Sequence, residues 1–111
     1  MESQARYNPQ EKFISKEFTY TLRERLRITI DKFDGEINSL AEAAKTELTI
    51  AGVSEEKVNN EKDSMIVEAI VAYVKANFGY DSPDADSFRN IFELYKKRLT
   101  LSSAYRAGGN P

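Results

Sequence analysis

Apolar and polar residues recur along this chain at the three- to four-residue spacing of amphipathic α-helices. The first such segment covers residues 16–28, and its apolar stripe consists of Phe18, Leu22 and Leu26. Arg23 and Arg27 lie four residues apart on another side of the same predicted helix, with Arg25 nearby. We therefore expect a short first helix that has an apolar face and a basic face.

A second helix is predicted over residues 34–51. Its apolar stripe consists of Ile37, Leu40, Ala41, Ala44 and Leu48. Asp34 is expected to cap the N-terminus, Glu36 places negative charge in the first turn, and Gly52 supplies a left-handed residue after the last turn. The alanines of this segment would let a neighbouring helix approach closely.

The segment 53–62 is polar and charged, and we expect a loop there. A third helix is predicted over residues 63–78, and it is the most hydrophobic segment of the chain. Glu68 and Lys75 are its obvious surface charges, so this helix is expected to be central in the fold or buried on two sides.

Gly79 is expected to end the third helix, and a fourth helix should begin with Ser82 as its N-cap and Pro83 at the first helical position. The apolar stripe of this fourth helix, which we assign to the core, consists of Phe88, Ile91, Phe92, Tyr95 and Leu99. Three cations near its C-terminal end suit the negative end of the helix dipole; they are Lys96, Lys97 and Arg98.

These patterns predict an all-α fold, a small bundle of about four helices, because no segment alternates like a strand and no internal repeat is visible. The 111 residues are enough for one domain with a single modest core. We expect a flexible N-terminal arm over residues 1–14, a helical domain over residues 15–103 and a flexible tail over residues 104–111.

Two absences exclude much catalytic chemistry. The chain has no cysteine and no histidine, which rules out disulfides, thiolate nucleophiles, histidine-based triads and ordinary zinc sites. We therefore assign no catalytic, cofactor-binding or metal-binding residue. No apolar run approaches the roughly 20 residues that cross a bilayer, and the polar N-terminus lacks a signal-peptide core, so we expect no membrane partner and a cytoplasmic origin.

Two oxygen-rich groups could suggest calcium loops. The first consists of Asp31, Asp34 and Glu36, and the second of Asp81, Asp84 and Asp86. In the first group, Phe33 and Gly35 stand where an EF-hand needs oxygen ligands, and the second lacks a closing glutamate at the proper spacing. We expect capping and turn chemistry to account for both groups.

The net charge of −2 is unevenly distributed. Residues 1–30 carry six basic and four acidic groups, residues 31–63 four basic and nine acidic, and residues 64–111 six basic and five acidic. The acidic middle argues against a uniformly basic nucleic-acid-binding surface. The arginine cluster of the first helix is left with three interpretations: a solvated face, a contact with DNA, or a partner for the acids of a neighbouring subunit.

The order of these segments resembles a known family. The elements that carry the resemblance are Leu26-Arg27-Ile28, the acidic turn Asp31 to Asp34, the helix from Ile37 to Lys45, the run from Ala69 to Tyr73 and the last helix from Phe88 to Leu99. Over roughly residues 21–105, this order is similar to that of the small head-tail connector proteins of tailed bacteriophages, the gp6-like adaptor or phage DNA-packaging family. The longer N-terminal extension and the segment 53–62 depart from the family pattern.

The resemblance implies structural work rather than catalysis. Such proteins assemble as a ring of about a dozen subunits beneath the portal of the filled head, where the ring extends the DNA channel and docks the next component. The implied partners are other copies of the chain, the phage portal protein and the next connector or tail protein, with packaged DNA nearby. The implied location is the head-tail junction of the virion, and the host cytoplasm before assembly.

A ring needs two different, complementary patches on each subunit. The candidate subunit-interface residues are Arg23, Arg25, Arg27, Asp31, Asp34 and Glu36. Within the tail, Tyr105 and Arg106 are candidates for docking a partner, because a tail of this kind could become ordered on contact. The alternative function is a small helical nucleic-acid-binding regulator, which the acidic middle disfavours; an enzyme is disfavoured by the absence of histidine and cysteine.

Overall fold

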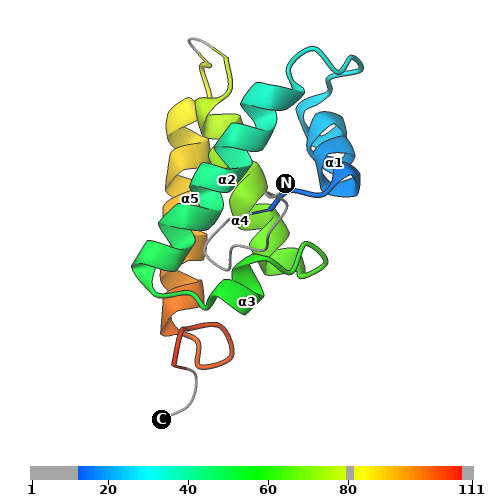
Figure 1. The fold of residues 1–111 in the computed structure, drawn as a ribbon. Helices are drawn as coiled ribbons and strands as arrows, with labels where there is room; N and C mark the ends of the chain where they lie inside the picture. The colour runs from blue at the N-terminus through cyan, green and yellow to red at the C-terminus, as the bar shows by residue number, and fades with distance from the viewer. Residues whose placement is uncertain (1–12, 80–81, 109–111) are drawn as a thin grey trace, which may run out of the picture.

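The structure, a computed structural model, describes residues 13–79 and 82–108, and its regular elements in these ranges are all helices (Figure 1). They are α1 (Lys16–Leu26), α2 (Asp34–Ala51), α3 (Glu55–Val58), α4 (Ser64–Asn77) and α5 (Ala85–Leu101). Within the described ranges, the β-type pairing is an isolated antiparallel bridge between Val53 and Arg106. The predicted all-α class is confirmed. Most of the predicted arm, residues 1–12, lies outside the described residues, as do Tyr80, Asp81 and residues 109–111.

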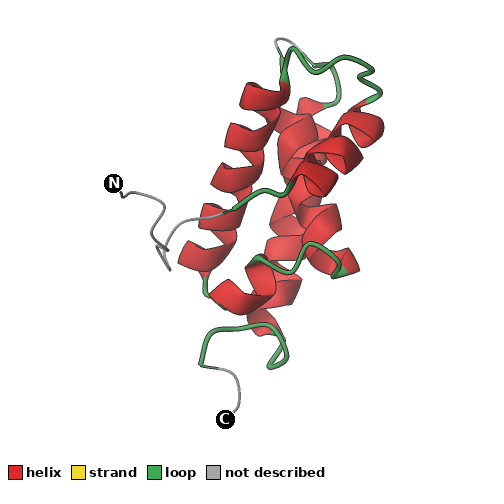
Figure 2. Ribbon diagram, turned by 45° about the vertical axis from the view of Figure 1, so that its right-hand side comes forward, coloured by secondary structure: helices red, strands yellow, loops and turns green. Residues whose placement is uncertain are grey.

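Helix α4 is the centre of the bundle and packs against α1, α2 and α5 (Figures 1 and 2). Its buried residues are Ile66, Ala69, Ile70, Val71, Ala72, Val74 and Ala76. Because these residues occupy most of its circumference, α4 can contact several helices at once. The central position expected for the third helix is confirmed.

Helix α2 has the bounds that its apolar spacing predicts. Ile37, Ala41, Ala44 and Leu48 of the predicted stripe are fully buried, and Leu40 packs against the same core from a partly buried position. The cap N–H of Gly52, whose φ is 120°, bonds to the carbonyls of Leu48 and Thr49, so a glycine ends this helix as expected. No helix of the described ranges is both long and apolar enough to span a membrane.

The predicted ends of α1 and α5, and the predicted N-cap of α2, need correction. Helix α1 ends at Leu26 because Arg27 takes the left-handed conformation, with a φ of 63°, and the N–H of Ile28 bonds back to the carbonyl of Arg23. Asp34 is not the N-cap of α2: Phe33 occupies that position, and the carboxylate of Asp34 is bound to Arg23 instead.

Helix α5 begins at Ala85, later than expected, with Asp84 as its N-cap residue. The N–H of Ala85 bonds to the carbonyl of Ser82, so Ser82 and Pro83 form a turn that precedes the helix. At the start of α4, by contrast, the side chain of Asp63 accepts hydrogen bonds from the N–H groups of Met65 and Ile66.

The segment 53–62 is not simply a loop, because it contains α3. The hydroxyl of Ser54 caps this short helix by accepting a hydrogen bond from the N–H of Lys57. Val53 and Val58 are both buried in the core. Two isolated valines in a charged segment are too few to show helical spacing, so the sequence pattern alone did not reveal α3.

Helix α5 contributes less to the core than its sequence predicts. Phe92 and Leu99 are buried, and the Phe92 ring lies 5.0 Å from that of Tyr73 in an edge-to-face contact. Phe88 and Tyr95 are partly buried, whereas Ile91 is 40% exposed. The assignment of Ile91 to the core is therefore wrong, because α5 packs on α4 along a narrower stripe than its apolar residues cover.

Candidate functional site

Two of the three arginines of the basic cluster are bound to carboxylates of the same chain. The Nε and Nη2 atoms of Arg23 donate to the two carboxylate oxygens of Asp34, at 2.8 and 3.2 Å. The two Nη atoms of Arg25 donate to the carboxylate of Glu68 on α4, both at 2.9 Å. Such two-pronged contacts fix geometry as well as charge, so they fasten α1 to the beginning of α2 and to α4.

The pair of Arg25 and Glu68 shifts the protonation equilibria of both groups. The hydrogen bond from Arg25 lowers the pKa of Glu68, and the hydrogen bond to Glu68 raises the pKa of Arg25. The two side chains are 38% and 40% exposed. Solvent therefore screens the pair, and its contribution to folding stability is below about 1 kcal/mol.

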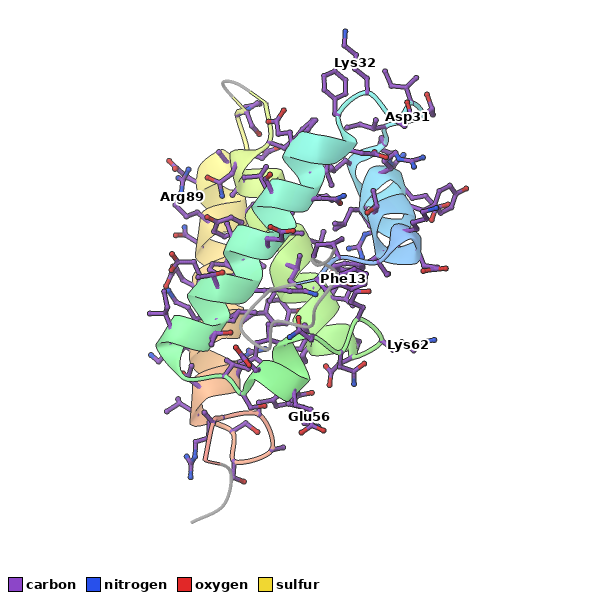
Figure 3. All side chains as sticks on the ribbon, in the orientation of Figure 1. Phe13, Asp31, Lys32, Glu56, Lys62 and Arg89 are labelled. Carbon is purple, nitrogen blue, oxygen red and sulfur yellow. The ribbon has the colours of Figure 1, made fainter. Side chains whose placement is uncertain are left out.

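The other candidate subunit-interface residues lie on or next to the connection between α1 and α2. Arg27 and Asp31 are exposed, and Asp31 lies beside Lys32 in the turn formed by residues 28–33 (Figure 3). Glu36 accepts a hydrogen bond from the N–H of Gly79 at 3.3 Å. The structure thus joins Arg23 to Asp34 and leaves the others in separate environments; their use as subunit contacts stays a prediction.

Neither oxygen-rich group forms a metal centre in the part of the chain that the structure describes. No group of three or more acidic residues there is placed to hold a metal ion. Asp34 is bound to Arg23, and Asp86 is bound to Arg89. Ion pairing occupies one carboxylate of each group, so the capping and turn chemistry that we expected does not account for all of these acids.

Residues 102–108 form a segment, here called the C-terminal strap, that folds back on the junction between α2 and α3. The N–H of Ser54 donates to the carbonyl of Tyr105 at 2.8 Å, and the N–H of Ala107 donates to the carbonyl of Gly52 at 2.6 Å. The isolated bridge to Arg106 belongs to the same contact. Part of the segment that we expected to be a flexible tail is therefore hydrogen-bonded to the bundle.

The side chain of Tyr105 attaches the C-terminal strap to α4. Its hydroxyl donates to the carboxylate of Asp63, with a closest oxygen distance of 2.9 Å, and the ammonium of Lys57 lies 5.6 Å from the centre of its ring. Burial, the hydrogen bond and the charge of Asp63 raise the pKa of Tyr105 above its ordinary value. Since Asp63 also caps α4, one carboxylate serves both the helix and the strap.

A hydrogen-bonded network around one buried lysine, here called the N-terminal lock, consists of Phe13, Ser15, Lys45, Asn59 and Glu61. Lys45 on α2 is fully buried, and its ammonium donates to the carbonyl of Phe13 at 2.6 Å, to Glu61 at 3.2 Å and to the Asn59 side chain at 3.3 Å. Glu61 also accepts from the hydroxyl of Ser15 at 2.6 Å. That hydroxyl in turn caps α1 by accepting from the N–H of Phe18.

Sequence reasoning missed the role of Lys45. The signal was its position: Lys45 follows Ala41 by four residues and Ala44 by one, which places it on the buried face of α2. A lysine on such a face needs acceptors, because an unpaired buried ammonium is very costly. The acceptors lie on residues before α2 and after α2 in the sequence, so the residue pattern within α2 alone cannot reveal them.

The comparison with known proteins bears on what these surfaces are for. A family model described as "Phage connector protein" matches residues 20–106 of this chain, from α1 to the C-terminal strap. The chain belongs to this phage connector protein family. Searches of curated proteins and of solved structures found no match.

Membership in the phage connector protein family gives the chain a structural role as a virion component that works with other phage head or tail proteins. The matched region includes Lys45, Asn59 and Glu61, whereas Phe13 and Ser15 precede it. For a structural protein the relevant sites are surfaces, so the exposed helix faces and the two ends of the bundle are the candidate functional regions.

Proposed function

We propose that this phage connector protein is a head-tail connector subunit of the gp6-like type. In this proposal, copies of the chain form a ring beneath the portal, and the ring extends the DNA channel and docks the next connector or tail component. The observation that carries the proposal is the family match over residues 20–106 of an all-helical bundle.

The attachment of both described ends of the chain to the bundle supports this function. A ring subunit has to present the same contact surfaces in every copy, which requires segments in defined positions. The N-terminal lock holds Phe13 and Ser15 against α2, and the C-terminal strap is bonded to the α2–α3 junction. The bundle therefore offers defined surfaces up to both of these ends.

The two ends of the bundle are candidates for different partners. The C-terminal strap, with Tyr105 and Arg106, lies at one end, and the turn 28–33 lies at the other (Figure 1). This turn exposes the side chains of Ile30 and Phe33. We assign the strap end to one axial partner and the turn to the other, so that the ring connects the portal with the next component.

The pairing of α1 arginines weighs against the nucleic-acid-binding alternative. Arg23 and Arg25 are each ion-paired with a carboxylate on another helix of the same chain. Fewer cations on this face are therefore available to neutralise phosphates. Proximity of the ring to packaged DNA needs no dedicated binding site of this kind.

The test is the absolute mass of the purified protein, measured by light scattering over a wide concentration range, alone and with purified portal rings. A discrete species of about ten or more subunits in either condition is the expected result. A protein that stays monomeric at every concentration and does not bind the portal would overturn the proposal. Tight, sequence-dependent DNA binding at moderate salt would support the regulator instead.

A further inference from the structure

The most exposed side of α5 combines apolar residues with unpaired cations. This surface, here called the α5 outer face, consists of Ile91, Leu94, Lys97, Arg98 and Leu101, which share one side of the helix. Leu94 is 48% and Leu101 69% exposed. Within the described residues, Lys97 and Arg98 form no ion pair, whereas the helix's acids at positions 86 and 93 are paired with its other cations.

Helix α2 has an exposed side of the opposite charge. This surface, here called the α2 outer face, consists of Ser39, Glu42, Thr46, Glu47 and Ile50. Ile50 is 76% exposed, and Glu42 and Glu47 form no ion pair with any residue that the structure describes. The cation of α2, Lys45, is buried in the N-terminal lock, so it cannot neutralise this face.

The two outer faces belong to two different helices. Helix α4 packs against both α2 and α5, and α2 and α5 also contact each other (Figure 1). Helices α2 and α5 run in the same direction and end at the same end of the bundle, where the N–H of Ala107 bonds to the carbonyl of Gly52. One chain therefore carries two different patches, one basic and apolar, the other acidic and apolar.

We propose that the α5 outer face of one copy docks on the α2 outer face of a second copy. The proposal rests on the proposed connector function and names the surfaces that would join neighbouring subunits. Two different patches that complement each other give a head-to-tail contact, which closes into a ring when the rotation between copies closes. Opposite charges select this pairing over contacts between two like faces.

When copies are related by a rotation about an axis along the helices, α5 of one copy and α2 of the next keep the common direction that they have within one chain. Apolar side chains are buried at such a contact and the charged pairs flank them, which is the usual anatomy of a specific interface.

A charge swap tests this contact. One variant carries Lys97→Glu and Arg98→Glu, and the other carries Glu42→Lys and Glu47→Lys. Each variant alone should associate at least about tenfold more weakly than the wild type, because faces of like charge then meet. An equimolar mixture should recover assembly, since each reversed face meets the reversed face of the other variant and each wild-type face meets its wild-type counterpart.

Two matched controls change the net charge equally at exposed sites elsewhere. They are Lys16→Glu with Lys62→Glu, and Glu24→Lys with Glu56→Lys. Both controls should assemble like the wild type, and thermal unfolding should show that all four variants are folded. Masses are measured by analytical ultracentrifugation at low and moderate salt; where the wild type assembles only on portal rings, the same variants are compared there.

The outcomes separate this inference from the function on which it rests. Wild-type assembly that both face variants retain would overturn the proposed contact and leave the connector function standing. Loss in each variant without recovery in the mixture would also overturn it, because the two faces would then contact something other than each other. A wild type that assembles neither alone nor on the portal would overturn the connector function, and this contact with it.

Discussion

The N-terminal lock and the C-terminal strap attach the two described ends of the chain to the bundle by different physical means. The lock holds the fully buried ammonium of Lys45 by acceptors on Phe13, Asn59 and Glu61. The strap uses backbone hydrogen bonds and the partly buried hydroxyl of Tyr105. The lock therefore depends on every partner being present, whereas solvent can replace the bonds of the strap one at a time.

This contrast follows from the cost of burying a charge. Removing one partner of a buried ion pair leaves the other charge without compensation in a medium that solvates it poorly. Near the surface, water takes over the broken hydrogen bonds, and such segments open locally at low cost. We thus expect the lock to stabilise the whole bundle, and the strap to open without unfolding it.

The largest effect should come from Lys45→Met. Glu61 and the carbonyl of Phe13 would lose their shared donor, and we expect the free energy of unfolding to fall by about 3–5 kcal/mol. Urea denaturation measures this. The control Lys62→Met, at an exposed neighbouring site, should change stability by less than about 0.5 kcal/mol. A loss for Lys45→Met no larger than that of the control would show that the lock is not a stabilising element.

Ser15→Ala should give the next largest effect. It removes the cap of α1 and one hydrogen bond to Glu61 while leaving the ammonium of Lys45 paired. We expect a loss of about 1–2 kcal/mol, again from urea denaturation. Ser54→Ala, which removes only the cap of α3, is the comparison, and it should cost less. Equal losses in the two variants would mean that the bond to Glu61 adds nothing.

Tyr105→Phe should loosen the C-terminal strap with little effect on the bundle. The hydrogen bond to Asp63 is lost near the surface, so global stability should fall by about 1 kcal/mol or less. Hydrogen exchange should become faster at the amides of Ser54 and Ala107, which hold the strap, and stay unchanged in α4. Faster exchange throughout α4 would instead place the strap in the same cooperative unit as the core.

The same tyrosine should respond to alkaline pH. Its raised pKa means that the folded state holds the phenol proton more tightly than the unfolded chain. This stabilisation is fully present below the ordinary tyrosine pKa of about 10 and is lost as the pH rises through the higher folded-state value. The difference in tyrosinate absorbance between wild type and Tyr105→Phe isolates this group. A midpoint at or below the ordinary value would contradict the assignment.

The smallest effect is expected for Glu68→Gln, because the ion pair with Arg25 is solvent-exposed. The loss at neutral pH should be below about 1 kcal/mol. Since the pKa of Glu68 is lowered in the folded state, its contribution is present above the unfolded-state pKa and disappears as the pH falls through the folded-state value. Thermal unfolding of wild type and variant should therefore converge in acid. A difference that persists in strong acid would point to packing rather than charge.

Local patterns predicted the elements whose information lies within one helix. The bounds of α2 and the central position of α4 follow from apolar spacing and, for α2, from the glycine at position 52 that ends it. The ends of α1 and α5 were predicted less well. An arginine such as Arg27 rarely takes the left-handed conformation, and Ser82 with Pro83 imitates a helix start although the pair forms the turn before Asp84. Helix α3 was missed because the two buried valines of segment 53–62 are recognisable as core residues only when the other helices are in place.

The sequence by itself determined the helical class, the absence of histidine and cysteine chemistry, and the order of segments that links the chain to phage connectors. Only the tertiary structure decided which charged side chains form ion pairs or hydrogen bonds within the chain. Arg25 meets a glutamate 43 residues away, and Lys45 meets a carbonyl 32 residues away. Helix formation depends on neighbours within a turn or two, whereas ion pairing depends on how helices pack. That packing binds Arg23, Arg25 and Lys45 within the chain and leaves the outer faces of α2 and α5 free for partners.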